Sequence, residues 1–529
     1  MSRLPAGAAV PCPEAPGSQG FSCTNAPGGS AIESPRLVVM VTVSGLRTDL
    51  FRLTLEGSGR DSLTAEGLFY TALRHPLLSA DPVASAAIIH TGRTPLENGI
   101  TARNPLRRLS EEGTTDGSRS VFFDKEASGL GTTDQISPKA LTAPTLGDAL
   151  KAATGGNGLV YSVALRAEEA VAMGGLTADG AFWIDEIRGA WASSSCYPGR
   201  LPWYISKLPS PRVRLSKGLK WTPVEADYEK SYARWIPSET GSGFEHDFTR
   251  FESYLTTPLA NQEVTNAALA LLESAGLGAD RYTDLLLLHY SVAPSAAIEA
   301  APAGALSPEL LDGCYRLAAE LERIRVQLPG GTLFVLLGDA MQPCRATGEN
   351  LREERTFYTD KCLALTNLYL DAEYGRKGLV REVTPDGRIF LDRDRIAAAA
   401  LSLKETEQRV TEFLREFAGV SYAFPARELL RASLSGGDDP ALLTAACAAL
   451  PRDRGDVVFG LLPGYRAAAG GTQTGGNGGG TQTTSYWAVE SPLLIIAPGL
   501  TPGEITVPTD LRNVSEIVSN ILRIRPPNR

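Results

Sequence analysis

The chain has 529 residues, of which 43% are hydrophobic and 21% are charged, and it carries a formal net charge of −9. This composition is typical of a folded globular protein, and the length is sufficient for one large domain with insertions. The acidic balance argues against a nucleic-acid-binding surface, which needs a basic face. The sequence contains no run of about 18 apolar residues, so we expect no transmembrane segment.

Residues 1–34 are rich in glycine, proline, alanine and serine and lack the apolar stretch of a signal peptide. We therefore expect a disordered N-terminal segment. The seven cysteines are dispersed along the chain and include no C-x-x-C pair. Their number and spacing suggest neither a disulfide framework nor a structural zinc site.

Residues 35–50 read PRLVVMVTVSGLRTDL and contain a nearly continuous apolar run that is rich in β-branched residues. Such a run predicts a strand that is buried on both faces of an α/β sheet. Open α/β sheets bind their ligands beyond the carboxyl ends of the strands. Ser44 and Gly45, at the end of the run, are therefore expected to face the functional site.

The segment V-S-G-L-R-T-D-L within this stretch resembles the V-D-Q-M-R-x-D-x opening of the PafA-type alkaline phosphatases. That family belongs to the alkaline phosphatase and nucleotide pyrophosphatase/phosphodiesterase superfamily. The resemblance implies an α/β fold, a three-layer α/β/α sandwich with a mostly parallel central sheet and an inserted cap subdomain. In the family the first Asp of this segment is a zinc ligand, and Ser44 takes its place here.

The sequence T-G-R-T-P-L-E-N-G-I at residues 91–100 resembles the family's T-G-T-T-P-x-x-H-G-I. The family's nucleophilic threonine lies upstream of this segment, and an alignment without gaps places Pro82 at its position. Proline has no hydroxyl group and cannot attack phosphorus. A shift of one residue would offer Asp81, and Ser85 and Ser44 are weak substitute nucleophiles. A serine at a helix start, as expected for Ser85, is more often a cap or packing residue.

The sequence S-V-A-L-R, which ends at Arg166, resembles the family's S-x-K-D-R, whose Lys and Arg bind the substrate phosphate. Ala164 replaces the lysine, so only half of this anion clamp remains. Asn104 or Arg103 would take the place of the family's phosphate-contacting asparagine. The resemblance therefore implies at most a residual anion pocket made by Arg166 and backbone groups near Ser44.

The remaining zinc ligands of the family follow three later strands. The predicted strand at residues 284–291 leads into S-V-A-P-S-A-A-I instead of S-x-T-D-x-x-G-H. A predicted helix at residues 307–328 precedes a strand at residues 332–337 that ends in G-D-A instead of A-D-H-G, and A-V-E-S-P replaces the family's D-T-H-V-P. The residues at the ligand positions are Pro294, Ile298, Asp339, Ala340 and Glu490. Only Asp339 and Glu490 can bind a metal, so we expect no cofactor, with zinc or magnesium as the alternative.

His289 lies inside the predicted strand at residues 284–291 and is one of only four histidines. A lone histidine in an apolar run is more often a hydrogen-bonded core residue than a metal ligand, because a zinc site needs convergent partners. We therefore expect His289 to be a core residue.

The resemblance extends over nearly the whole chain and predicts its division. Residues 35–340 and 453–529 are expected to form the alkaline-phosphatase-like core, and residues 341–452 an inserted α+β cap. Residues 467–485, AAAGGTQTGGNGGGTQTTS, predict a flexible glycine-rich loop within the core. The cap segment is similar to alkaline-phosphatase-like proteins of Bacteroidales bacteria.

Two functional interpretations follow. In the first, the protein is a catalytically degenerate pseudo-phosphatase that binds an unknown protein or a phosphorylated small molecule. In the second, it is an active metal-dependent phosphomonoesterase or phosphodiesterase with a site rearranged around Asp339, Glu490, Ser44 or Ser85, and Arg166. The first is favoured because the nucleophile and most zinc ligands are replaced together. Family precedent favours the periplasm or cell envelope, although the absence of a signal peptide from the sequence as written leaves the cytoplasm open.

Overall fold

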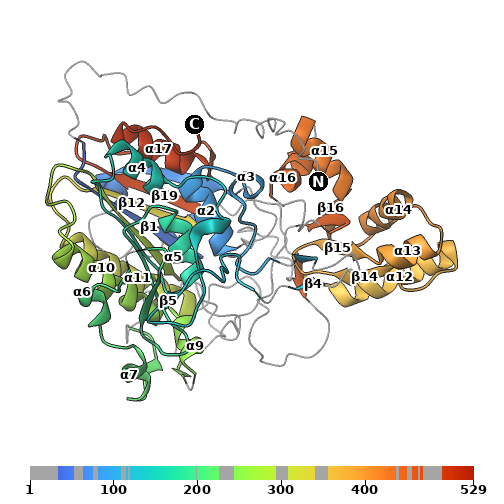
Figure 1. The fold of residues 1–529 in the computed structure, drawn as a ribbon, viewed down its shortest axis with the longest axis horizontal. Coiled ribbons are helices and arrows are strands. Elements are labelled where there is room, and N and C mark those ends of the chain that lie inside the picture. Colours follow the sequence, from blue (N-terminus) through green and yellow to red (C-terminus); the bar gives the residue numbers. More distant parts are fainter. Residues whose placement is uncertain are drawn as a thin grey trace.

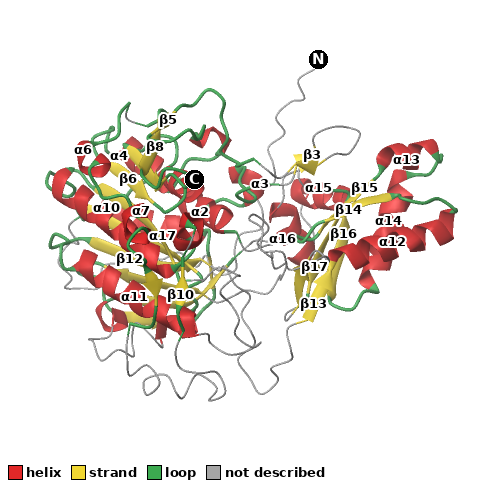
Figure 2. Cartoon of the chain, turned by 90° about the horizontal axis from the view of Figure 1, so that it is seen from below, coloured by secondary structure: helices red, strands yellow, loops and turns green. Residues whose placement is uncertain are grey.

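The structure, a computed structural model, describes residues 34–529 except a set of short internal segments. A large α/β body and a smaller lobe lie side by side (Figure 1, Figure 2). The segments that are not described are residues 53–62, 76–80, 106, 109–114, 117–118, 198, 225–243, 249, 293–307, 340–354, 436–439, 449–454, 463–464 and 469–490.

An eleven-stranded, mostly parallel sheet forms the centre of the large body. Its middle strand β1 (Leu37–Ser44) runs parallel to both neighbours, β12 (Leu333–Asp339) and β11 (Asp284–Ser291). All three strands are buried, except for the last residue of β11, as the sequence predicted. The other strands of this sheet are β2 (Leu68–Arg74), β5 (Gly129–Leu130), β6 (Val160–Val163), β7 (Gly180–Ile184), β8 (Trp191–Ser194), β19 (Ser491–Ile496), β20 (Gly503–Ile505) and β21 (Thr509–Asp510).

Helices cover both faces of this sheet, which confirms the predicted three-layer sandwich. Successive residues of β1 point to opposite faces, so Val39 and Val41 join one hydrophobic cluster and Val38 and Met40 the other. The first cluster packs under α9 (Phe251–Leu255), α10 (Asn261–Ser274) and α11 (Pro308–Arg325). The second packs under α2 (Pro82–Thr91), α4 (Leu146–Ala153), α5 (Ala167–Gly174) and α17 (Asn513–Leu522).

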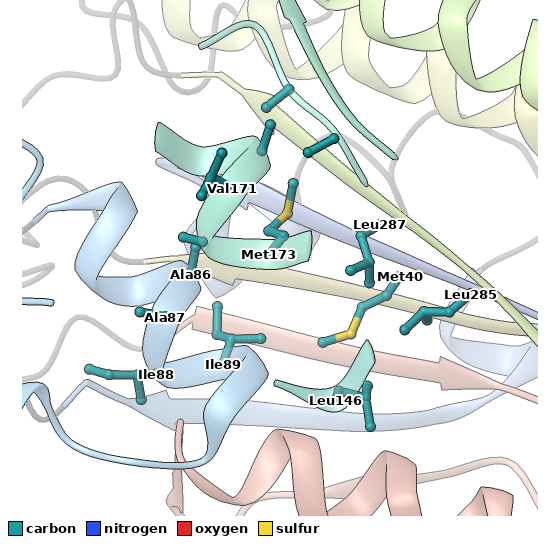
Figure 3. Close-up of a cluster of buried hydrophobic side chains, with 14 of the residues drawn as sticks. Met40, Ala86, Ala87, Ile88, Ile89, Leu146, Val171, Met173, Leu285 and Leu287 are labelled. Carbon is teal, nitrogen blue, oxygen red and sulfur yellow. The ribbon is translucent and has the colours of Figure 1, made fainter. Parts of the chain in front are cut away.

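The second face positions the candidate site. Figure 3 shows Ile89 of α2 and Met173 of α5 gathered with Met40, Leu285 and Leu287 of the sheet. Helix α2 is buried on every side except at its first residue, because the sheet, α5, α3 (Pro95–Asn98) and α17 all pack against it. Burial of each large apolar side chain stabilises such a layer by about 1.5–3 kcal/mol. The start of α2 is thereby fixed relative to the strand ends.

The smaller lobe has its own sheet and its own hydrophobic core. Its antiparallel strands, in spatial order, are β14 (Val380–Val383), β15 (Arg388–Leu391), β17 (Val457–Leu461) and β16 (Val420–Pro425). Because β17 belongs to this lobe, the prediction that the chain has returned to the core by residue 453 is wrong. The helices are α12 (Thr359–Tyr374), α13 (Arg393–Ala398), α14 (Leu403–Arg415), α15 (Ala426–Ser435) and α16 (Pro440–Ala448), and β13 (Arg355–Tyr358) pairs with β18 (Tyr465–Ala468).

Cys447 in α16 is disulfide-bonded, whereas Cys196 and Cys362 carry free thiols. The dispersed spacing of the cysteines gave no indication of this bond. No helix in the described part of the chain is both long enough and apolar enough to span a membrane.

Two predicted flexible segments fall largely on residues that the structure does not describe. These are the N-terminal segment, except residue 34, and the glycine-rich loop, except residues 467–468, which end β18. The remaining short elements are α1 (Thr48–Phe51), η2 (Leu63–Glu66), β3 (Arg107–Arg108), β4 (Thr115–Asp116), η3 (Pro138–Ala140), α6 (Trp203–Ser206), α7 (Arg212–Leu215), β9 (Lys220–Trp221), β10 (His246–Asp247) and η4 (Pro258–Ala260).

Candidate functional site

The three central strands change from apolar to polar along the face that α2 and α5 cover. The change comes near the carboxyl end of each strand, where α/β sheets place their ligand sites. Alternate residues of a strand share one face, so the polar residues on this face can be read from the sequence of each strand. The residues on this face are Val38, Met40, Thr42 and Ser44 on β1, Leu285, Leu287 and His289 on β11, and Leu333, Val335, Leu337 and Asp339 on β12.

The strand register brings three of these polar side chains together. Ser44 lies opposite Asp339 on β12, and Thr42, two residues earlier, lies opposite His289 on β11. Residues that are paired across neighbouring strands project to the same side of the sheet. Ser44 therefore lies between a carboxylate on one side and an imidazole on the other.

Hydrogen bonds join these three side chains. Ser44 Oγ lies 3.0 Å from Asp339 Oδ2 and 3.0 Å from His289 Nε2, and the last two atoms are 3.5 Å apart. All three residues are buried. A carboxylate can only accept, and a hydroxyl has one proton to donate, so Ser44 donates to Asp339 and accepts from the Nε2–H of His289. We call Ser44, His289 and Asp339 the strand-end cluster.

Close backbone contacts fix the position of this cluster. Gly45 has a φ of +83° and donates its N–H to the carbonyl oxygen of Asp339 over 3.2 Å. A side chain at Gly338 would place its Cβ 2.0 Å from the carbonyl oxygen of Leu46. Both positions therefore require glycine, one because of its left-handed backbone and the other because of the close approach.

Two further histidines lie near the cluster, His90 fully buried and His75 partly buried. His75 Nε2 lies 2.9 Å from Ser491 Oγ, and burial lowers the pKa of His75 to about 4 despite the nearby Asp339 and Asp510. Burial and repulsion from His289 lower the pKa of His90, on α2, to about 3. Both imidazoles are therefore neutral at neutral pH, and neither adds positive charge to the site.

Asp81 and Pro82 form the start of α2, where the family resemblance places the nucleophile. Asp81 is the N-cap, and its Oδ1 accepts the N–H groups of Val83 and Ala84 at 2.9 and 3.1 Å. Its Oδ2 accepts the N–H of Arg103 at 3.0 Å. Both carboxylate oxygens thus hold backbone groups, and burial raises the pKa of Asp81.

Ser85 lies one turn further along α2. Its side chain is fully buried, and its Oγ has no hydrogen-bond partner among the described residues. Ser85 thus lies within the buried layer that α2 forms on the sheet.

The arginines at the predicted phosphate positions are paired with carboxylates of the same chain. Arg166, the N-cap residue of α5, places Nη1 2.8 Å from Glu186 Oε1. Arg103 forms an ion pair with Glu169, and its Nη1 lies 4.0 Å from Glu168 Oε2. Burial acts to lower the pKa of Arg103, but these acidic neighbours outweigh it and raise the pKa. The predicted phosphate ligand Asn104, by contrast, is exposed.

The structure brings together Ser44 and Asp339 of the predicted site, whereas Arg166 pairs with Glu186. His289, expected to be a hydrogen-bonded core residue, is one, and its partner is Ser44. The sequence did contain a signal that His289 belongs to the site: it shares a strand face with Leu285 and Leu287 and lies near the carboxyl end of β11. The predicted ligand positions Pro294, Ile298, Ala340 and Glu490 lie outside the described residues.

The described residues do not fit a dinuclear zinc centre. Across the described ranges, no group of three or more His, Cys, Asp or Glu side chains is placed to hold a metal ion. Asp339 Oδ1 is buried without a partner among these residues, so one carboxylate oxygen remains available. A single carboxylate with one imidazole supplies fewer ligands than even one tetrahedral zinc requires.

Comparisons with known proteins give consistent matches, although no protein-family model matches the chain. Alkaline phosphatase PhoV of Synechococcus elongatus is 28% identical over 315 residues, which is 55% of either chain. Alkaline phosphatase PafA of Elizabethkingia meningoseptica is 22% identical over 534 residues, covering 94% of this chain and 93% of PafA. The crystal structure of wild-type PafA superimposes with a TM-score of 0.76 at 20% identity, covering 94% of this chain and 97% of that one.

Proposed function

Because this chain belongs to the alkaline phosphatase and nucleotide pyrophosphatase/phosphodiesterase superfamily, we propose that it is a catalytically degenerate member of it. It keeps the fold and binds a ligand or a protein partner instead of hydrolysing phosphate esters. The ligand or partner is a protein or a phosphorylated small molecule. The relatives named above are alkaline phosphatases. On this proposal, the activity has been lost through substitutions in this chain.

The observation that carries this proposal is the start of α2. Covalent phosphoryl transfer needs a nucleophile with a free lone pair that points at the substrate. Pro82 has no such group, and the oxygens of the preceding Asp81 hold the N–H groups of Val83, Ala84 and Arg103. An attack by Asp81 would break the cap of a buried helix. Neither of the two residues at this position is therefore suited to be the nucleophile.

The electrostatics of the same region support the proposal. A transferring phosphoryl group carries negative charge that cations must offset in the transition state. Arg103 and Arg166 are the cations at the predicted phosphate-binding positions, and each is already paired with a glutamate. Their charge is neutralised before any substrate binds. A phosphorylated ligand would have to displace Glu169 or Glu186.

A second candidate function, hydrolysis by a rearranged site, is favoured by one contact. Ser44 Oγ lies 3.0 Å from His289 Nε2, and a serine beside a histidine is the usual pair of nucleophile and base. The same hydroxyl donates to Asp339, however, so His289 Nε2 is the donor and not the acceptor of this contact. His289 cannot take the proton of Ser44 until the hydrogen bonds rearrange. This candidate therefore ranks second.

We propose a periplasmic or cell-envelope location. The disulfide bond of Cys447 supports this proposal, because disulfides persist in oxidising compartments and are rare in the cytosol. Non-reducing and reducing electrophoresis of protein extracted with the thiols blocked would test the bond in the native host.

Hydrolysis assays test the proposed function. The purified chain would be incubated with p-nitrophenyl phosphate and bis-p-nitrophenyl phosphate, with zinc or magnesium added, beside an active alkaline phosphatase as positive control. We expect any residual rate to be the same in wild type and in the Ser44→Ala and Ser85→Ala variants. Metal-dependent hydrolysis that either substitution abolishes would support the rearranged site and contradict the degenerate one.

A further inference from the structure

The family resemblance and the structure disagree about what joins the ends of the central strands. The resemblance makes the positions of Ser44 and Asp339 zinc ligands. In this chain one of the two is a serine, and zinc sites in proteins are built from Cys, His, Asp and Glu. Instead of facing a cation together, the two side chains hydrogen-bond to each other over 3.0 Å.

His289 completes the contact from the other side. Its Nε2 is 3.0 Å from Ser44 Oγ and 3.5 Å from Asp339 Oδ2, so the three residues connect β11, β1 and β12 in order. Ser44 uses its proton on Asp339 and its lone pair on His289. The hydroxyl thus gives the buried Asp339 carboxylate a donor and the buried His289 imidazole an acceptor.

We propose that the strand-end cluster stands in the place of a metal site and that a single residue, Ser44, prevents it from binding metal. The Ser44 hydroxyl holds Asp339 and His289 together by hydrogen bonds, as an ion would by coordination. Two groups of suitable chemistry, the Asp339 carboxylate and the His289 imidazole, lie on either side of Ser44. A carboxylate at position 44 would make three converging ligands, two carboxylates and one imidazole, which is the ligand chemistry of a mononuclear zinc site. The inference rests on the proposed function, since it concerns the same site.

Ser44→Asp is the test of this proposal, with Ser44→Asn as the matched control. The two variants have nearly the same shape, but only Ser44→Asp adds a carboxylate. Without metal, Ser44→Asp places two carboxylates next to each other in a buried site, and their repulsion lowers Tm. With zinc added, we expect about one zinc per chain by equilibrium dialysis and recovery of Tm by several degrees.

The control and the wild type are both expected to differ from Ser44→Asp. Ser44→Asn and wild type should bind no zinc at this site, and the Tm of neither should change with zinc or with a chelator. A wild-type Tm that falls on chelation would overturn the proposal. So would Ser44→Asp that is folded by circular dichroism and yet gains no zinc over Ser44→Asn. If Ser44→Asp does not fold even with zinc, the chelator measurement on the wild type decides alone.

Failure of this inference is distinguishable from failure of the proposed function. Zinc-dependent stability in a wild type that hydrolyses no phosphate ester would refute the inference and leave the proposed function standing. Hydrolysis by a wild type whose stability does not depend on metal would do the reverse.

Discussion

The face of the sheet beneath α2 and α5 has two halves that are held together by different forces. In the apolar half, Met40, Leu285 and Leu287 pack with Ile89 and Met173 by contacts that have no required direction (Figure 3). In the polar half, the strand-end cluster depends on hydrogen bonds in which each donor has a specific acceptor. The same strands and the same helices build both halves. Chemistry can therefore change in the polar half while the apolar half keeps the fold.

The largest expected effect is in the apolar half. Leu287→Ala removes a fully buried side chain and should lower the free energy of unfolding by about 2–5 kcal/mol, because it leaves a cavity. Chemical denaturation followed by the fluorescence of the buried Trp183 would measure it. Leu368→Ala, on an exposed residue of α12, is the control and should change stability by less than about 0.5 kcal/mol. Equal effects would mean that this face is not the core of the large body.

The second prediction concerns the polar half. Ser44→Ala leaves His289 Nε2 and Asp339 Oδ2 without their shared partner and should cost about 1–3 kcal/mol of unfolding free energy. Ser85→Ala is the matched control, because its equally buried hydroxyl bonds to none of the described residues. The same denaturation experiment separates the two variants. If Ser85→Ala cost as much as Ser44→Ala, the hydrogen bonds of the cluster would not be its source of stability.

The third prediction concerns the helix that covers both halves. Asp81→Ala removes the N-cap of α2 and should lower the free energy of unfolding by about 0.5–2 kcal/mol. Asp81→Asn keeps an acceptor oxygen for Val83 and Ala84 and should cost less. An equal loss in both variants would show that the charge of Asp81, and not its capping, matters to the fold.

The last prediction concerns the dependence of stability on pH. His90 is neutral in the folded protein, with a pKa lowered from 6.5 to about 3, so the unfolded chain binds its proton more tightly. Its contribution to stability is complete above the unfolded pKa of 6.5 and declines as the pH falls toward 3. Tm measured between these values should therefore fall less steeply in His90→Phe than in wild type. Identical slopes would contradict the burial of a neutral His90.

The sequence predicted the apolar half better than the polar half, for a physical reason. The apolar runs of β1 and β11 each define a buried strand locally, and those predictions are confirmed. The partner strands of β17 are not encoded in its own apolar residues, and this strand was assigned to the wrong sheet.

The contacts of the candidate site are equally non-local. Ser44 and His289 are 245 residues apart in the chain, and Arg103 and Glu169 are 66 apart. No local pattern pairs such residues. The family resemblance pointed to Ser44 and Asp339 in the sequence. Only the structure shows that the two residues are paired across β1 and β12 and hydrogen-bond to each other.

The metal content of wild-type protein purified without chelators tests the central claim most directly. Elemental mass spectrometry would count the ions per chain. If hydrogen bonds within the strand-end cluster have replaced the metal centre, zinc should be well below one equivalent. About two zinc ions per chain, the content of a dinuclear phosphatase site, would contradict the account.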